Sequence, residues 1–165
     1  MQFTFPIIET PRLLLNQIDE SEADQIIDIS FYDGKQAKNG TESRQFLENI
    51  NADYLKGETF HWALRLKTDP LSIIGTCGYY RGFRDKTGEL GCILKEKYQK
   101  HGFMTEAMTA IIGFGFDKLG LETIVAWTSR TNYPALSILS KLNFIEVISE
   151  YEEYAKFARR KSIKK

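Results

Sequence analysis

Apolar residues along this chain follow two periods, one typical of strands and one typical of helices. Runs with strand character occur at 10–15, 59–66, 72–80, 89–94, 123–128 and 144–151. Apolar residues three and four positions apart predict helices over 21–29, 41–55, 104–119 and 134–142. Between the first two helices, residues 31–40 show little periodicity. We interpret them as a loop that either covers a substrate pocket or only connects two elements.

Capping residues support several of these helix boundaries. Ser21, with Asp24 three positions later, fits an N-cap. Gly57 and Gly120 follow their helices as C-caps usually do. Pro134 suits a first helical turn, where its missing N–H costs nothing. The pattern therefore gives four separate helices interleaved with strands.

The order strand, helix, strand, helix, strand in the second half requires crossovers that pack against a sheet. The residues therefore predict an α/β (α+β) architecture built on a mixed sheet. A chain of 165 residues suits one domain, which we place at 1–158. We interpret residues 159–165, rich in Lys and Arg, as a solvated basic C-terminal tail, with an RNA or acidic partner as the alternative.

Charge and cysteine content exclude several classes of protein. Lys plus Arg and Asp plus Glu number 22 each, which argues against DNA or an anionic membrane as the partner. Cys77 and Cys92 cannot form a dense disulfide framework, so we expect both to be reduced. The chain shows neither a signal-like start nor a membrane-spanning stretch, so we expect a cytoplasmic location. His61 and His101 lack companions at metal spacing, and we expect no metal site.

A strand, a short loop and a helix start follow one another at residues 89–105. Gly102 precedes the longest predicted helix, whose first turn presents free N–H groups at the positive end of its dipole. Glycine there lets a phosphate approach the backbone. Thr105 adds a hydroxyl, and Lys97 and Lys100 add positive charge. The segment predicts an anion site suited to a pyrophosphate.

The same segment, YQKHGFMTEA at 98–107, resembles the coenzyme A pyrophosphate loop of GNAT acetyltransferases, Gln/Arg-x-x-Gly-x-Gly/Ala. Gln99 and Gly102 match the first two anchors, whereas Met104 replaces the third, as in the RimL-like branch that acetylates ribosomal protein N-termini. NYPALSILSKLNF at 132–144 is similar to a second family motif, Asn-x-x-Ser/Ala followed by Lys-Leu-Gly-Phe. TPRLLL at 10–15 resembles the start of the RimJ/RimL branch.

The resemblance implies the GNAT fold: a mixed, mostly antiparallel, splayed sheet of six to seven strands flanked by about four helices. It implies acetyl-coenzyme A (acetyl-CoA) as cosubstrate. The loop that would bind the pyrophosphate comprises Gln99, Lys100, His101, Gly102, Phe103, Met104 and Thr105. The backbone of Cys92, Ile93 and Leu94, together with Asn132, would bind the pantetheine arm.

The family mechanism implies direct attack of an amine on the thioester within a ternary complex. Glu89 takes the position of a general base, and an N–H near 92–94 would stabilise the oxyanion. Leu139 and Ala135 occupy the positions where the family usually has the acid that protonates the thiolate. Ser137 is therefore our candidate acid, with Tyr133 or water as alternatives.

The resemblance implies a primary amine as the acceptor, either a protein N-terminus or a small molecule such as a polyamine or an aminoglycoside. Five residues are candidates for lining its groove: Trp62, Tyr79, Tyr80, Arg81 and Phe83. The missing acids favour one alternative, a catalytically weak domain that binds acetyl-CoA as a sensor. We expect a monomer or a homodimer.

Overall fold

The computed structural model describes residues 4–163. The elements in chain order are β1 (Ile8–Glu9), β2 (Leu13–Gln17), the 3-10 helix η1 (Glu20–Ile29), β3 (Phe31–Tyr32), β4 (Lys35–Gln36), α1 (Gly40–Leu55), β5 (Phe60–Leu66), β6 (Gly75–Tyr80), η2 (Arg84–Lys86), β7 (Thr87–Leu94), η3 (Glu96–Tyr98), α2 (Phe103–Asp117), β8 (Thr123–Ser129), α3 (Tyr133–Lys141), β9 (Ile145–Val147) and β10 (Tyr154–Arg160).

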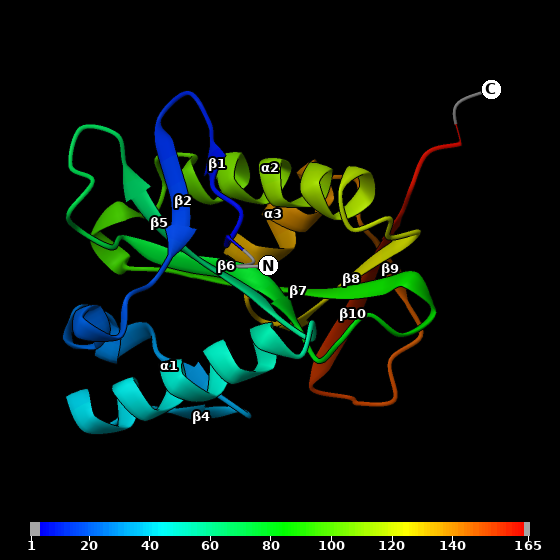
Figure 1. Cartoon of the computed structure of the whole chain (residues 1–165). Helices are drawn as coiled ribbons and strands as arrows, with labels where there is room; N and C mark the ends of the chain where they lie inside the picture. Colours follow the sequence, from blue (N-terminus) through cyan, green and yellow to red (C-terminus); the bar gives the residue numbers. More distant parts are fainter. Residues whose placement is uncertain (1–3, 164–165) are drawn as a thin grey trace.

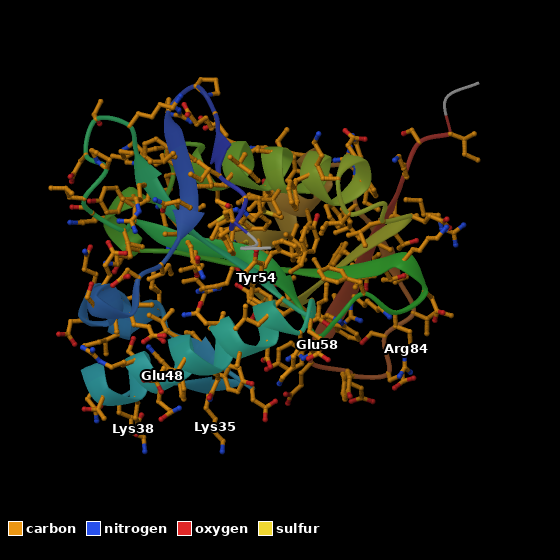
Figure 2. All side chains as sticks on the ribbon, in the orientation of Figure 1. Lys35, Lys38, Glu48, Tyr54, Glu58 and Arg84 are labelled. Atoms are coloured by element: carbon orange, nitrogen blue, oxygen red, sulfur yellow. The ribbon has the colours of Figure 1, made fainter. Side chains whose placement is uncertain are left out.

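One eight-stranded sheet, in the order β1-β2-β5-β6-β7-β8-β10-β9, runs through the middle of the molecule. Helices α2 and α3 cover one face, and α1 covers the other, with the small β3–β4 hairpin beside it (Figure 1). Lys35 and Lys38, on the outer side of the α1 layer, point away from the sheet (Figure 2). The strand count exceeds the expected six to seven, while the predicted architecture is confirmed.

The sheet opens between β7 and β8, its only parallel pair among the described residues. Only Thr87, Gly88 and Glu89 pair with β8, opposite Thr123 to Val125. Beyond Glu89, β7 continues to Leu94 with β6 on its other side, and β8 continues to Ser129 beside β10. Because the two strands part there, the backbone of 90–94 faces a gap, which confirms the predicted splay.

Helix α2 packs against the sheet through a stripe of small and apolar residues. Ala107 and Ile111 are completely buried, as expected for residues on one helical face. Gly115 lies over Tyr79, and a Cβ there would come within 2.2 Å of the tyrosine hydroxyl. The hydroxyl donates to the Ile111 carbonyl oxygen at 2.9 Å. The absent side chain therefore lets the helix approach β6 closely.

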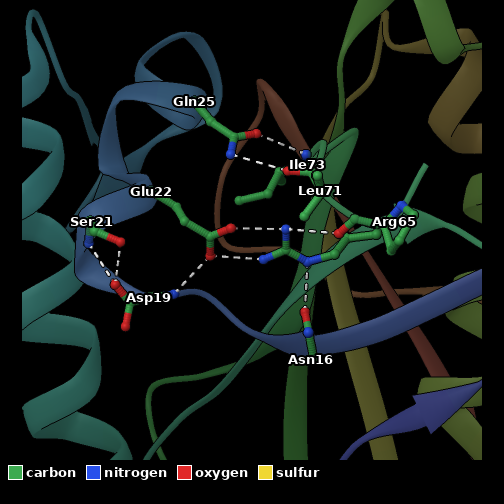
Figure 3. A network of polar contacts seen from close by, with 9 residues as sticks. Asn16, Asp19, Ser21, Glu22, Gln25, Arg65, Leu71 and Ile73 are labelled. Carbon is green, nitrogen blue, oxygen red and sulfur yellow. Dashed lines mark hydrogen bonds and ion pairs between the residues drawn. The ribbon is translucent and has the colours of Figure 1, made fainter.

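Helix η1 is tied to the sheet by an ion pair that is nearly buried (Figure 3). Arg65 on β5, with a side chain 5% exposed, binds Glu22 through both Nη atoms at 3.0 and 2.8 Å. Its Nε donates to Asn16 on β2 at 2.8 Å. Glu22 also accepts the Asp19 N–H, which closes a capping box. The cap is Asp19, so the predicted Ser21 cap is wrong; Ser21 donates to the Asp19 carboxylate instead.

Two further predictions need correction. The predicted strand 144–151 is the much shorter β9, and β10 was missed. Strand β10 pairs along its whole length with β8 and takes Arg159 and Arg160 out of the segment predicted as a tail. Its cations lie over aromatic rings, since Lys156 Nζ is 5.2 Å from the Trp127 centroid. Residues 31–40 contain the β3–β4 hairpin.

Candidate active site

A pocket of about 510 Å³ lies on the α1 side of the sheet. The β3–β4 hairpin contributes residues 31–34, so this segment borders the pocket and is more than a connector. Gly91, Cys92 and Ile93 on β7 and Trp127 on β8 also line it. The pocket is therefore lined by both strands that border the gap, β7 and β8.

On β7 the pocket is lined at Gly91, where the strand carries no side chain. Gly78 on β6 and Gly91 on β7 lie directly opposite each other. The ring of Tyr80 covers Gly91, because a Cβ built on that glycine would lie 3.1 Å from Tyr80 Cε2. Tyr80 Oη lies 2.6 Å from His61 Nδ1 on β5. Burial lowers the pKa of His61 from 6.5 to about 4, so the ring is neutral at physiological pH.

Glu89 is the last β7 residue that pairs with β8, at the point where the sheet opens. Its side chain is 24% exposed and forms an ion pair with Arg81. Both residues line the pocket together with the carboxylates of Asp53 and Glu58. Asp53 accepts a hydrogen bond of 2.9 Å from the Tyr32 hydroxyl. The predicted base thus lies in a pocket with more acidic than basic side chains.

The predicted cofactor loop leads from β7 into α2. Gly102 is the N-cap of α2, with a φ of 79° in the left-handed region. The first helical bond runs from the Glu106 N–H to the Gly102 carbonyl at 3.1 Å. The N–H groups of 103–105 precede that bond and point out of the helix end. Gln99 Nε2 donates to the Leu94 carbonyl at 3.0 Å, which fixes the start of the loop against β7.

An ion pair and several hydrogen bonds join this loop to the segment between β1 and β2. Arg12 donates through Nε to Glu106 at 2.7 Å and through Nη1 to the His101 carbonyl at 2.9 Å. Its guanidinium lies 4.5 Å from the centroid of the Phe103 ring. Thr10 Oγ1 also donates to Glu106, at 2.6 Å. Burial raises the pKa of Glu106, but the bonds from Thr10 and Arg12 outweigh it and leave the pKa below its ordinary value.

The other candidates lie outside the pocket. Asn132 is the N-cap of α3, and its Oδ1 accepts the Ala135 N–H at 3.3 Å. Ser137 is exposed on α3 and does not line the pocket that contains Glu89. Leu139 is 4% exposed and belongs to the core. Ser137 thus lies on α3, the helix on the face of the sheet opposite to α1 and the pocket (Figure 1).

The predicted acceptor groove is only partly correct. Tyr80 and Arg81 line the pocket, whereas Trp62 and Tyr79 are completely buried on the other face of the sheet. Phe83 packs beside that core. Successive strand residues point to opposite faces, which separates the two adjacent tyrosines.

Sequence reasoning missed three residues of this region: Arg12, His61 as a partner of Tyr80, and Trp127. Arg12 lies within the TPRLLL segment, so its motif was visible while its contact with the loop was not. Nothing in the sequence pairs His61 with Tyr80, because that contact depends on strand register. Residues 4–163 contain no group of three or more His, Cys, Asp or Glu placed to hold a metal ion. In the same range, every helix is too short or too polar to span a membrane.

Comparison with known proteins shows the family to which this site geometry belongs. Residues 12–145 match the family model described as an acetyltransferase (GNAT) domain. The uncharacterized N-acetyltransferase YoaA of Bacillus subtilis (strain 168) is 26% identical over 148 residues, covering 85% of this chain and 83% of that protein.

Solved structures show the same fold at low identity. A putative ribosomal-protein-serine acetyltransferase from Vibrio cholerae superposes with a TM-score of 0.83 at 19% identity, covering 96% of this chain and all of that chain. The microcin C7 self-immunity acetyltransferase MccE, solved with acetyl-CoA and AMP, gives a TM-score of 0.77 at 14% identity, with 92% and 93% covered.

Proposed function

The chain belongs to the GNAT acetyltransferase family, and from that premise we propose that it transfers the acetyl group of acetyl-CoA to a primary amine by direct attack within a ternary complex. One observation carries the proposal: the pocket is bordered by both sides of the gap, by Gly91 to Ile93 on β7 and by Trp127 on β8. An acceptor in the pocket and a thioester in the gap would meet there.

The chain's own groups fit acetyl-CoA, which supplies an activated acetyl thioester when bound. Gly102 leaves the helix end open, since the atom nearest to a Cβ built there is Arg12 Nη2 at 3.4 Å. The N–H groups of 103–105 and the positive end of the α2 dipole suit a diphosphate. The loop from Gln99 to Thr105 is our proposed pyrophosphate site.

The pantetheine arm would lie along the open edge of β7. The backbone of Cys92, Ile93 and Leu94 has β6 on one side and the gap on the other. Amide groups in an arm beside this edge would continue the sheet's hydrogen bonding. Asn132 retains its side-chain N–H groups for the arm, because only its oxygen is used as the cap.

For the chemistry, Glu89 would take the proton of the attacking ammonium, directly or through water. An N–H near Cys92 would stabilise the oxyanion, a role that needs a fixed donor and no particular side chain. Ser137 stays our candidate for protonating the thiolate. Its exposure on α3 makes water an equally accessible donor.

The acceptor is the finer part of the proposal. A protein N-terminus is favoured by the likeness to the Vibrio cholerae enzyme, whose name specifies ribosomal protein serine. Small-molecule amines are favoured by the carboxylates of Asp53, Glu58 and Glu89 in the pocket, which attract cationic acceptors. A second candidate function, acetyl-CoA sensing with little turnover, is favoured by the buried Leu139 at a usual acid position.

Calorimetry with acetyl-CoA and thiol release with Ellman's reagent separate these functions. The amine panel comprises a peptide with an N-terminal serine, spermidine and an aminoglycoside. Binding with thiol release supports the transferase and identifies its acceptor class. Binding without release for any amine supports the sensor. Absence of acetyl-CoA binding overturns both. Intact mass of an extract incubated with labelled acetyl-CoA extends the panel to natural acceptors.

A further inference from the structure

Tyr79 and Tyr80 are consecutive on β6 and point to opposite faces of the sheet. Tyr79 is completely buried beneath α2, where its hydroxyl donates to the Ile111 carbonyl. Tyr80 faces the pocket, where its hydroxyl lies 2.6 Å from His61 Nδ1. The sequence thus provides two chemically identical side chains, one in the core and one in the lining of the pocket.

Tyr80 lies on the strand next to β7, which carries both the proposed base and the proposed oxyanion site. It is directly opposite Glu89 in the β6–β7 register. Its ring also covers Gly91, which precedes Cys92 on the open edge. Tyr80 and His61 line the same pocket as Glu89 and the β7 edge at 91–93, so an amine bound in that pocket can contact the tyrosine hydroxyl.

The chemistry of the attacking amine determines what kind of partner can hold it. Its lone pair has to point at the thioester carbonyl, so the protein can bind it only by accepting its N–H groups. A tyrosine oxygen accepts such a bond, and keeps accepting it if its own proton is committed elsewhere. His61, neutral because burial lowers its pKa, can serve as that other acceptor through Nδ1 in the tautomer that carries its proton on Nε2.

We propose that the Tyr80 oxygen accepts a hydrogen bond from an N–H of the acceptor amine and so aims the amine lone pair at the thioester. His61 Nδ1 in turn accepts a hydrogen bond from the Tyr80 hydroxyl and fixes its direction. Tyr80 is then a catalytic residue and His61 a positioning residue. Tyr80 keeps its proton throughout. Glu89 takes the proton that the ammonium loses before attack, and the second proton, which the nitrogen loses after attack, leaves through water and balances the proton that the thiolate takes up. This inference rests on the proposed function, because it needs an amine in the pocket.

Tyr80→Phe and Tyr79→Phe form a matched pair for testing this role. Each removes one hydroxyl and keeps the ring. With the best amine of the panel, Tyr80→Phe is expected to lower kcat/KM for the amine about tenfold while KM for acetyl-CoA stays unchanged, the scale for one hydrogen bond lost in the transition state. Tyr79→Phe is expected to lower thermal stability and leave both kinetic constants as in the wild type.

His61→Phe tests whether His61 acts through the Tyr80 hydroxyl. Without its acceptor, the Tyr80 hydroxyl competes for the amine lone pair, so this variant is expected to lose about as much kcat/KM for the amine as Tyr80→Phe. The double variant His61→Phe/Tyr80→Phe is expected to be no worse than either single variant. Acetyl-CoA binding by calorimetry verifies that each variant is folded.

Three results would overturn the inference: wild-type kinetics in Tyr80→Phe, equal kinetic losses in Tyr79→Phe and Tyr80→Phe, or independent losses in the double variant. A wild-type enzyme that binds acetyl-CoA but acetylates no amine would instead overturn the proposed function. The two failures are therefore distinguishable.

Discussion

Arg12 and Glu106, 94 positions apart, form an ion pair of 2.7 Å that joins the bend before β2 to the first turn of α2. A carboxylate in that turn would repel a bound diphosphate if it were free. Arg12 neutralises it and at the same time bonds the His101 carbonyl of the loop. The pair therefore allows the helix end to hold an anion despite its acidic residue.

Glu106→Gln is expected to destabilise the fold by about 1–3 kcal/mol near neutral pH, the range for hydrogen bonds to a charged group. The folded pKa of Glu106 lies below its ordinary value of 4.5, so its contribution is present above 4.5 and is lost as the pH falls through the folded pKa. Urea unfolding across this range measures the difference. Glu9→Gln, in an exposed pair with Lys67, is the control and should change stability by less than about 0.5 kcal/mol. A difference that persists at acid pH would contradict the assignment.

Gly102→Ala is expected to weaken acetyl-CoA binding. The φ of 79° is unfavourable for alanine by about 1–2 kcal/mol, and the added methyl group would occupy the proposed approach of the diphosphate. Gly113→Ala, within α2 and with open space around it, should leave binding unchanged and stabilise the helix by up to about 1 kcal/mol. Calorimetry measures both, and equal affinities would argue against the proposed loop.

Glu89→Gln is expected to lower turnover about 100-fold with acetyl-CoA affinity retained, the scale for losing a general base. The amide keeps the size of the side chain but accepts no proton. Rates are compared with the best amine of the panel as the pH is varied. If the variant keeps the wild-type pH–rate profile, Glu89 is not the base.

Cys92 is expected to react with iodoacetamide while Cys77 does not, because Cys92 is exposed and Cys77 is completely buried. If the pantetheine arm follows the β7 edge, acetyl-CoA at about ten times its dissociation constant should slow the labelling of Cys92 about tenfold, by occupancy alone. Peptide mass spectrometry assigns the site. If bound acetyl-CoA does not slow the labelling of Cys92, the pantetheine arm does not lie beside this residue.

Glu22→Ala is expected to destabilise the protein by about 3 kcal/mol, because it leaves the Arg65 guanidinium, 5% exposed, without its carboxylate. Chemical unfolding at neutral pH measures the effect. The exposed pair Lys86–Glu122 supplies the control, since Glu122→Ala should cost about 0–1 kcal/mol. Similar losses in both variants would mean that the buried pair gives no special stability.

The sequence predicted the elements with strong local signals. Helix α2 has a regular apolar stripe and glycines near both ends, and it begins one residue before its predicted start. Strand β10 was missed because its sequence, YAKFARR, looks like a charged surface. Its long cations lie on the aromatic rings of Trp127 and Phe116, contacts that no local pattern reveals.

The candidate site also has one part that the sequence predicted and one part that it did not. The loop around Gly102 is contiguous, so its motif and its position before α2 were visible together. The pocket depends on register: Tyr80 meets His61 and Glu89 because three strands align, and a shift of one residue would place Tyr79 there instead. Arg12 reaches the loop from the bend before β2, far away in the chain, and only the fold determines this contact.

With only three residue pairs between β7 and β8, the two parts of the sheet are joined by a short seam. A ligand that filled the remainder of the gap would act as a strand that the chain itself does not supply. Its amides would complete a ladder in the middle of the fold, so the contacts that recognise the ligand would also strengthen the protein. The substrate would then serve, for as long as it is bound, as a part of the architecture.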